Sequence, residues 1–241
     1  NRGKESIALN LKKEEDKKIF DKILSKADIL VENFKPGTLE KWGYGWKEVN
    51  KRFPKLIYAS ASGFGQTGPL KKLPAYDMVV QGMGGLMSVT GQPNSEPTRV
   101  GTSIGDITAG LFTAIGINAA LFDRQKTGKG MYIDVSMLDC QIAILENAIA
   151  RYLSKNEIPK PMGSRHPSIA PFEAFKTKDS HIIIAAGNDK LFEKLCILLD
   201  MKEIINDPKF SDNSSRAKNM DELKKILEDK LVNRKTNEWV N

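Results

Sequence analysis

The sequence predicts an α/β protein with a parallel sheet, followed by a second, smaller α/β unit. In the first half of the chain, short runs rich in β-branched and aromatic residues alternate with amphipathic runs, which favours strands linked by crossover helices. Four prolines fall within 155–171, where the periodicity is lost. Strand-like and helix-like runs begin again after that segment. We therefore expect part of a large domain over 1–154, a linker or active-site loop over 155–171, and the start of a small domain over 172–241.

The elements of the large domain follow from the spacing of its apolar residues. Strands are expected in the short β-branched or aromatic runs, and helices where apolar residues recur three and four positions apart. In chain order these are a strand at 6–11, a helix at 14–27, a strand at 28–34, mostly helix over 38–53, a strand at 56–64, helix over 77–90, a long helix that includes Asp106, a strand at 131–137 and a helix at 138–154. Gly128 follows basic residues and suits the left-handed position just after the C-terminus of the long helix.

The small domain is expected to open with two paired strands. The runs at 172–177 and 181–187 flank a polar turn at Lys178-Asp179-Ser180, which is typical of a β-pair. The runs at 191–200 and 220–232 have the period of amphipathic helices.

Composition indicates a soluble globular protein. Hydrophobic residues make up 40% of the chain, and we find neither an apolar run of membrane-spanning length nor a signal-peptide pattern. Cys140 and Cys196 lie in apolar helical runs, which predicts buried, unpaired thiols in a reducing compartment, and we expect a cytoplasmic protein. His166 and His181 are the only histidines and have no metal-ligand spacing, so no metal site is expected. The chain begins with Asn1 and stops without a natural end, which suggests a fragment.

The net charge of +7 favours an anionic partner without naming one. Acidic residues are interleaved with the lysines, as in the run at 12–26, and this pattern is typical of a solvated helix face. Clustered aromatic residues are also absent from the basic runs, so nucleic-acid binding is not expected.

Asp106 is the first candidate for chemistry. It stands with Gly105 at the entrance of a helix rich in glycine, alanine and threonine. The amides of the first turn and the helix dipole favour the charged form of an Asp there, and a carboxylate nucleophile must be ionised. Local sequence alone favours the alternative that Asp106 is a structural N-cap.

A second candidate is the segment Asn33-Phe34-Lys35-Pro36-Gly37, which follows a predicted strand. Ligands bind at the carboxyl ends of strands in open α/β sheets. Phe34 can stack on a base, Asn33 can hydrogen-bond one, and Lys35 and Lys41 can reach phosphates. The alternative is a strand end with a buried Phe and a Pro-Gly turn, and turn chemistry alone accounts for that pair.

The segment Gly63-Phe64-Gly65-Gln66-Thr67-Gly68 matches the G-x-G-x-x-G pattern of dinucleotide-binding loops. Such a loop must open directly into a helix, whereas the residues that follow have no apolar helical stripe and end at Pro74. We therefore expect no nicotinamide or flavin site. The glycines are expected to let the backbone turn sharply and approach a ligand or another chain.

Taken together, these segments resemble the class III CoA-transferases, a group that includes formyl-CoA, carnitine-CoA and succinate–hydroxymethylglutarate CoA-transferases. The resemblance lies in the order and spacing of NRGKESIALNLK, ADILVENFKPGTLEKWG, LIYASASGFGQTGP, PAYDMVVQGMGGLMSVTG, GTSIGDITAG, ALFDRQKTGKGMYIDVSMLD and GSRHPSIAPFEAFKTKDSHIIIAAGND. It covers essentially the whole chain. It implies an open, nucleotide-binding-like large domain, a smaller α/β domain, and an interlocked homodimer of full-length chains.

The resemblance also implies the site residues. Asp106 fills the nucleophile position of the family's G-D-x-x-(T/A)-G segment. The residues implied to contact the coenzyme are Leu9, Asn10, Lys12, Asn33, Phe34, Lys35, Lys41, Ala75, Tyr76, Asp77 and Met137. Pro74 stands where some relatives have Lys, and the family's N-terminal nucleotide-binding segment and C-terminal return to the large domain are not found in this chain.

The implied reaction moves CoA from an acyl-CoA donor to a free carboxylic acid, with dicarboxylic acids among the candidate acceptors. Acyl-CoA is a substrate, and no tightly bound cofactor is implied. Asp106 would form a mixed anhydride and then an aspartyl-CoA thioester. Gly163-Ser164 is a weak candidate for stabilising the oxyanion, and Arg165 or His166 could pair with a distal carboxylate of the acid, although solvated loop residues are an equal alternative.

Two alternatives remain within this resemblance. α-Methylacyl-CoA racemases share the fold and need a second acid/base group, a His, where this chain has Tyr76. Because an ordinary Tyr titrates near pH 10, it is a poor base at neutral pH and the transferase is favoured. The other alternative is a non-catalytic CoA-binding relative, and the presence of Asp106 argues against it.

Overall fold

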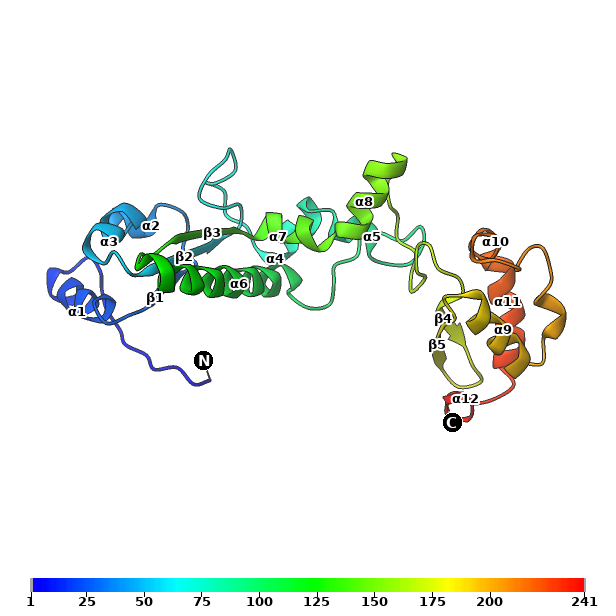
Figure 1. Cartoon of the computed structure of the whole chain (residues 1–241). Coiled ribbons are helices and arrows are strands. Elements are labelled where there is room, and N and C mark those ends of the chain that lie inside the picture. Colours follow the sequence, from blue (N-terminus) through cyan, green and yellow to red (C-terminus); the bar gives the residue numbers. More distant parts are fainter. Residues whose placement is uncertain (1, 241) are drawn as a thin grey trace. The chain divides into compact units, whose positions relative to one another are not determined.

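The computed structural model describes residues 2–240, which form two compact units (Figure 1). The first unit comprises the chain up to Thr90 together with Pro97–Pro159. The second comprises Gly91–Glu96 together with the chain from Lys160 onward.

The first unit is built on a three-stranded parallel sheet in the order β1-β2-β3. Its strands are β1 (Ile29–Glu32), β2 (Ile57–Ser62) and β3 (Tyr132–Ser136). The central strand β2 pairs in register with both neighbours, with Ala59 opposite Val31 on one side and Ile133 on the other. Almost every residue of β2 is buried, as expected for an inner strand of a covered parallel sheet. The predicted α/β class and parallel sheet are confirmed.

The helices of the first unit fill the connections between the strands and follow the last of them. They are α1 (Glu14–Leu24), α2 (Thr38–Lys41), α3 (Trp46–Arg52), α4 (Asp77–Met83), α5 (Leu86–Val89), α6 (Ile104–Thr127), α7 (Met137–Ile144) and α8 (Glu146–Lys155). The long helix α6 lies along the sheet in Figure 1 and contacts β2 and β3. Small residues make this close packing possible, because a Cβ at Gly116 would come within 3.0 Å of Ile133 Cγ2.

Helix α6 is the one segment among residues 2–240 that is long and apolar enough to cross a membrane by length and composition. This corrects the expectation that no apolar stretch approaches that length. In the structure the helix packs its small residues on the parallel sheet and exposes larger apolar ones, among them Leu111, Ile115 and Phe122. Gly128 ends it at φ +69°, and its N–H donates to Arg124 O at 2.8 Å, which confirms the predicted C-terminal glycine.

Four predicted elements differ from the structure. The helix expected over 77–90 divides into α4 and α5 at Gly85, whose φ is +88°. Residues 6–11 form no strand, because no neighbouring strand among the described residues pairs with them. The helical stretch over 38–53 divides into α2 and α3 because Gly43, at φ +86°, turns the chain between them. The expected helix over 138–154 divides at Leu145, whose backbone leaves the helical conformation.

The second unit pairs β4 (Phe172–Lys176) with β5 (His181–Ala185) in antiparallel register. The remaining elements are α9 (Asp189–Leu198), the 3₁₀ helix η1 (Lys202–Ile204), α10 (Asn213–Lys218), α11 (Met220–Leu231) and α12 (Thr236–Val240). The predicted β-pair and the two longer helices are confirmed. Phe175, Phe192 and the leucines of α11 form a buried core. Arg216 is fully buried beside it and donates to Ala170 O, Phe210 O and Asp189 Oδ1, so its charge is both hydrogen-bonded and paired.

Candidate functional site

A pocket of about 350 Å³ lies at the carboxyl ends of the three parallel strands of the first unit. Its walls come from the residues just after β1, from the end of β2 and the returning loop, from the start of α6, and from the first residue after β3. The lining residues are Asn33, Phe34, Lys35, Pro36, Ser62, Gly63, Leu73, Pro74, Ala75, Tyr76, Asp106 and Met137. This is the edge at which open α/β sheets bind ligands, and the volume is within the range of ligand pockets.

The segment after β1 is held by its own polar groups. Asn33 Nδ2 donates to Ala61 O at 2.6 Å, which ties the end of β1 to β2. The Phe34 N–H donates to Glu32 Oε2 at 2.8 Å, and the Phe34 ring meets Trp42 edge-on at 5.6 Å between centroids. Phe34 is nevertheless 48% exposed and lines the pocket, so its ring can be contacted by a ligand there. The alternative of a buried Phe at this strand end is therefore wrong.

The loop after β2 folds back on its own start. A Cβ at Gly63 would lie 2.4 Å from Cβ of Ala75, so the two ends of the loop touch. Gly63 O also accepts from the Leu138 N–H at 3.1 Å, which fixes the loop to the start of α7. Tyr76, which follows Ala75 in the chain, is 80% exposed and lines the pocket. The glycines serve close approach and turning, and no helix opens before α4 at Asp77.

Asp106 reaches the pocket from the first turn of α6. It is the third residue of the helix, after the N-cap position at Ser103. Its carboxylate is exposed, and none of the described residues forms a hydrogen bond or an ion pair with it. It therefore does not cap the helix through its side chain, and a substrate can approach it.

The electrostatics of Asp106 differ from the sequence-based expectation. Partial burial, and secondly the negative charge of Asp77, raise the pKa of the Asp106 carboxyl above its ordinary value. We expected the first-turn amides to favour the ionised form, but its oxygens accept no hydrogen bond from those amides. A carboxylate with a raised pKa is more basic, and its ionised form is therefore a better nucleophile.

The structure brings together seven of the predicted site residues and leaves five elsewhere. Those that line the pocket are Asn33, Phe34, Lys35, Ala75, Tyr76, Asp106 and Met137; those that do not are Leu9, Asn10, Lys12, Lys41 and Asp77. Asn10 forms a turn before α1, in which its Oδ1 accepts from the Lys12 N–H at 3.1 Å. Lys41 is exposed at the end of α2. Asp77 is buried and both of its carboxylate oxygens accept hydrogen bonds within the protein.

Sequence reasoning missed Ser62, Gly63 and Leu73 as pocket residues. Ser62 and Gly63 follow the same strand-end rule that singled out Asn33, so that rule was the signal available. The Ser62 hydroxyl is buried and has no hydrogen-bond partner among the described residues. Leu73 gave no signal, since a loop leucine carries no periodic pattern.

The comparisons with known proteins agree with this geometry. The sequence profile of CoA-transferase family III matches residues 1–241. This chain belongs to CoA-transferase family III. The resemblance stated from the sequence motifs is therefore confirmed.

Two relatives show how far the similarity extends. The chain is 47% identical over 241 residues to acetyl-CoA:oxalate CoA-transferase of Acetobacter aceti, an alignment that covers 100% of this chain and 62% of that protein. It is 39% identical over 240 residues to succinyl-CoA:glutarate CoA-transferase of Homo sapiens, covering 100% of this chain and 55% of that protein. The chain thus spans somewhat more than half the length of these relatives.

A solved structure has a similar fold over the whole chain. A CAIB/BAIF family protein from Brucella suis is 40% identical and superposes with a TM-score of 0.86, covering 100% of this chain and 64% of that chain. The mixed α/β fold is therefore shared with this CAIB/BAIF family protein.

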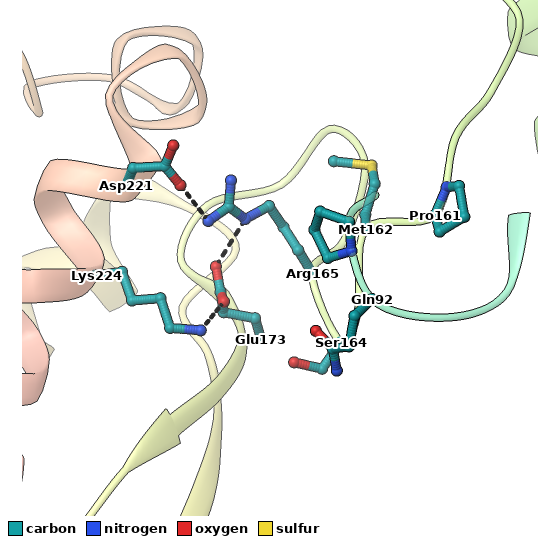
Figure 2. A pocket seen from close by; sticks show the side chains of 9 residues that line it. Gln92, Pro161, Met162, Ser164, Arg165, Glu173, Asp221 and Lys224 are labelled. Atoms are coloured by element: carbon teal, nitrogen blue, oxygen red, sulfur yellow. Dashed lines mark hydrogen bonds and ion pairs between the residues drawn. The ribbon is translucent and has the colours of Figure 1, made fainter. Parts of the chain in front are cut away.

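A second pocket, of about 400 Å³, lies within the second unit of this family III chain and contains Arg165 (Figure 2). Arg165 Nε donates to Glu173 Oε1 at 2.9 Å and its Nη2 donates to Asp221 Oδ1 at 2.7 Å. Lys224 Nζ pairs with the other oxygen of Glu173 (Figure 2). Two cations thus face two carboxylates, and the network ties the segment before β4 to α11.

The imidazole of His166 makes its contacts within the protein. His166 Nδ1 accepts hydrogen bonds from the backbone N–H groups of Ser168 and Ile169, and the ring stacks on Phe172 at 5.2 Å between centroids.

Cys140 and Cys196 are buried and unpaired, as predicted. Burial raises the pKa of each thiol to about 11, so neither is a reactive thiolate near neutral pH.

Proposed function

We propose that the protein carrying this chain transfers CoA from an acyl-CoA donor to a free carboxylic acid, with Asp106 as the nucleophile. The observation that carries the proposal is an accessible carboxylate that has no partner among residues 2–240. It lies at the carboxyl edge of a parallel sheet, in a pocket that also holds a cation and an exposed aromatic ring. Membership of CoA-transferase family III supports this reaction class.

The proposed reaction proceeds through covalent intermediates on Asp106. A carboxylate oxygen attacks the thioester carbon of the donor, the C–S bond breaks, and a mixed anhydride and the CoA thiolate result. The thiolate then attacks the aspartyl carbon, releases the donor acid and leaves an aspartyl-CoA thioester. The acceptor carboxylate attacks that thioester to give a second anhydride, and the thiolate attacks its acyl carbon, which forms the new acyl-CoA and frees Asp106.

The pocket residues fit the recognition of a coenzyme with a base and phosphates. The half-exposed ring of Phe34 suits stacking on a base, and Lys35 supplies a positive charge for a phosphate in the same pocket. The alternative within the fold, an α-methylacyl-CoA racemase, needs a second acid/base group, and the pocket offers the Tyr76 hydroxyl at that place.

We propose dicarboxylic acids as the acceptors. The relatives named above are CoA-transferases that act on oxalate and glutarate, and both acids are dicarboxylates. Cytoplasmic location and a homodimer of full-length chains remain part of the proposal, the first because both cysteines are free.

The test is to replace Asp106 in the complete protein and measure transfer between acyl-CoA donors and dicarboxylic acids by mass spectrometry. Asp106→Asn keeps the size of the side chain but removes the nucleophilic oxygen anion, so transfer should be lost while CoA binding persists. Wild-type protein incubated with acyl-CoA should carry a covalent adduct, and Asp106→Asn should not. Transfer by Asp106→Asn at near the wild-type rate, with the Asn shown intact by peptide mapping, would rule out Asp106 as the nucleophile.

A further inference from the structure

The buried residue Asp77 joins α4 to the start of α6. Its side chain is 8% exposed, and Oδ1 accepts the N–H of Gly105 at 2.8 Å. Gly105 is the residue just before Asp106, in the first turn of α6, where backbone N–H groups have no partner within the helix. Ser103, at the N-cap position, makes no side-chain capping bond. The Asp77 carboxylate, which belongs to another helix, thus accepts an N–H of the first turn of α6 that the side chain at the N-cap position leaves without a partner.

Gln81 extends this contact to the loop before α6. It is fully buried one turn after Asp77, and its Nε2 donates to Asp77 Oδ2 at 2.8 Å. Its Oε1 accepts the N–H of Val100 at 2.9 Å. Both polar ends of the amide are therefore used. One continuous set of three hydrogen bonds runs from residue 100 through Gln81 and Asp77 to residue 105.

The packing beside these bonds leaves little freedom. A Cβ at Gly105 would lie 2.7 Å from Val80 Cγ2 and 3.0 Å from Asp77 Oδ1. Glycine at this position lets α4 approach closely enough for the carboxylate to reach the amide. Tyr76, which directly precedes Asp77, lines the pocket. The start of α4 therefore contributes one residue to the pocket wall and the next one to the hydrogen bond with Gly105.

We propose that Asp77 is a positioning residue for Asp106: with Gln81 it clamps the entrance of α6, so that the Asp106 carboxylate is held toward the pocket. This inference rests on the proposed function, since it takes Asp106 to be the nucleophile. A buried and fully hydrogen-bonded clamp matters to catalysis because small displacements of a reacting group cost large factors in rate. It also gives Asp77 a different role from contact with the coenzyme.

The clamp has an electrostatic consequence for Asp106. The negative charge of Asp77 contributes, after partial burial, to the raised pKa of Asp106. Titratable groups on the elements that pack against α6, or in the same pocket, are Lys35, Tyr58, Tyr76, Asp77, Tyr132, Asp134, Asp139 and Cys140. Of these, Asp77 is the one whose charge contributes to the shift. Because the ionised carboxylate is the nucleophile, activity should fall as the pH drops through this pKa.

The experiment uses Asp77→Asn in the complete protein. Asn retains an oxygen for the Gly105 N–H but removes the charge, and its Nδ2 then faces the Gln81 Nε2, so two donors meet. We expect kcat to fall by about 10- to 100-fold while KM for acyl-CoA stays within about twofold. The acid limb of the pH profile of kcat/KM should move to lower pH, because the pKa of Asp106 falls when the neighbouring charge is lost. The limb reports the charge of Asp77, whereas the fall of kcat at a constant KM in a folded variant reports the positioning of Asp106.

A double variant tests the geometry of the clamp. In Asp77→Asn with Gln81→Glu, the amide and the carboxylate exchange places, and all three hydrogen bonds can form again. The new carboxylate at position 81 accepts the N–H of residue 100 and the side-chain N–H of the new amide at position 77. The oxygen of that amide accepts the N–H of residue 105. We expect kcat to recover at least tenfold over Asp77→Asn, with circular dichroism confirming that both variants are folded. No recovery in the folded double variant, or an unchanged kcat in Asp77→Asn, would overturn the inference.

The parallel Asp106→Asn variant separates this failure from that of the proposed function. If Asp106→Asn is inactive and Asp77→Asn behaves like wild type, Asp77 does not position Asp106, and the assignment of Asp106 as the nucleophile is retained. If Asp106→Asn transfers CoA normally, the nucleophile is wrong and the clamp inference falls with it.

Discussion

Gly63 and Ala75 lie so close together that a Cβ at residue 63 would stand 2.4 Å from the Cβ of Ala75. The same Cβ would also lie 3.2 Å from the Ala75 backbone nitrogen, so a rotamer change cannot relieve the contact. Both residues line the pocket that holds Asp106. The shape of the pocket therefore depends on the absence of a single side chain.

Gly63→Ala should displace the loop between β2 and α4 and weaken CoA binding. Overpacking of this kind costs about 1–3 kcal/mol, and we expect the free energy of unfolding to fall by that amount. Urea denaturation measures the stability, and isothermal titration calorimetry with CoA measures the binding. Gly110→Ala is the matched control, since Gly110 lies in α6 with nothing within 4 Å of a Cβ. It should stabilise the protein by about 0.5–1 kcal/mol. Equal behaviour of the two variants would show that the close approach is not required.

Lys35 and Lys41 can be separated as phosphate partners by charge reversal. Lys35 lines the pocket, whereas Lys41 is exposed at the end of α2 and does not. Lys35→Glu should therefore weaken CoA binding more than Lys41→Glu at low salt. Both losses should shrink at high salt because exposed charges are screened. Binding measured by calorimetry at two ionic strengths decides this, and a larger loss for Lys41→Glu would place the phosphates away from the pocket.

Arg165 is predicted to act on stability and not on the choice of acid. Its guanidinium is committed to Glu173 and Asp221 (Figure 2), and Glu173 is 3% exposed. Arg165→Met leaves that buried carboxylate with Lys224 alone, so we expect the free energy of unfolding to fall by about 1–3 kcal/mol. KM values for dicarboxylic and monocarboxylic acceptors should change by the same factor. A selective loss for dicarboxylic acids would restore Arg165 as the partner of a distal carboxylate.

The elements that could be predicted from the sequence are those marked by a pattern within their own residues. The strands β1, β2 and β3, the helix that includes Asp106 and the glycine that ends it all carry a period or a terminal residue of their own. The strand at 6–11 was wrong because alternation shows that a segment can be a strand and does not show that a neighbour exists to pair with it. The break at Leu145 was missed because the apolar period continues through it.

The candidate site could be predicted only where it follows the strand-end rule or a family motif. Asn33 to Lys35 and Asp106 were found in this way, and the structure brings them to one pocket. The role of Asp77 was out of reach, because its partner Gly105 is 28 residues away and nothing in the sequence shows that α4 and α6 touch. The pKa of Asp106 is raised first by partial burial and secondly by the charge of Asp77, and neither is visible in the local sequence, so the rule for helix N-termini gave the opposite direction.

The reaction type can be decided by the hydrogen on the α-carbon of the acyl group. A racemase removes that proton and returns one from solvent, so it introduces deuterium in heavy water. A transferase that works through an Asp106 anhydride changes bonds only at the carbonyl carbon and never touches the α-carbon. With Tyr76 where a racemase needs a histidine base, we expect CoA to move between two acids without enzyme-dependent deuterium uptake at the α position.

One incubation in heavy water makes both measurements. The complete protein is given a 2-methylacyl-CoA with succinate or glutarate as acceptor, and mass spectrometry follows new CoA thioesters and α-deuteration together. Asp106→Asn serves as the control, because it should abolish thioester formation and leave only the background exchange of the free thioester. Deuterium incorporation above that background without a new thioester would identify a racemase. A new dicarboxylyl-CoA with background deuterium assigns the Asp106 carboxylate to attack on the carbonyl carbon, which is the chemistry that an unpartnered carboxylate in this pocket is placed to perform.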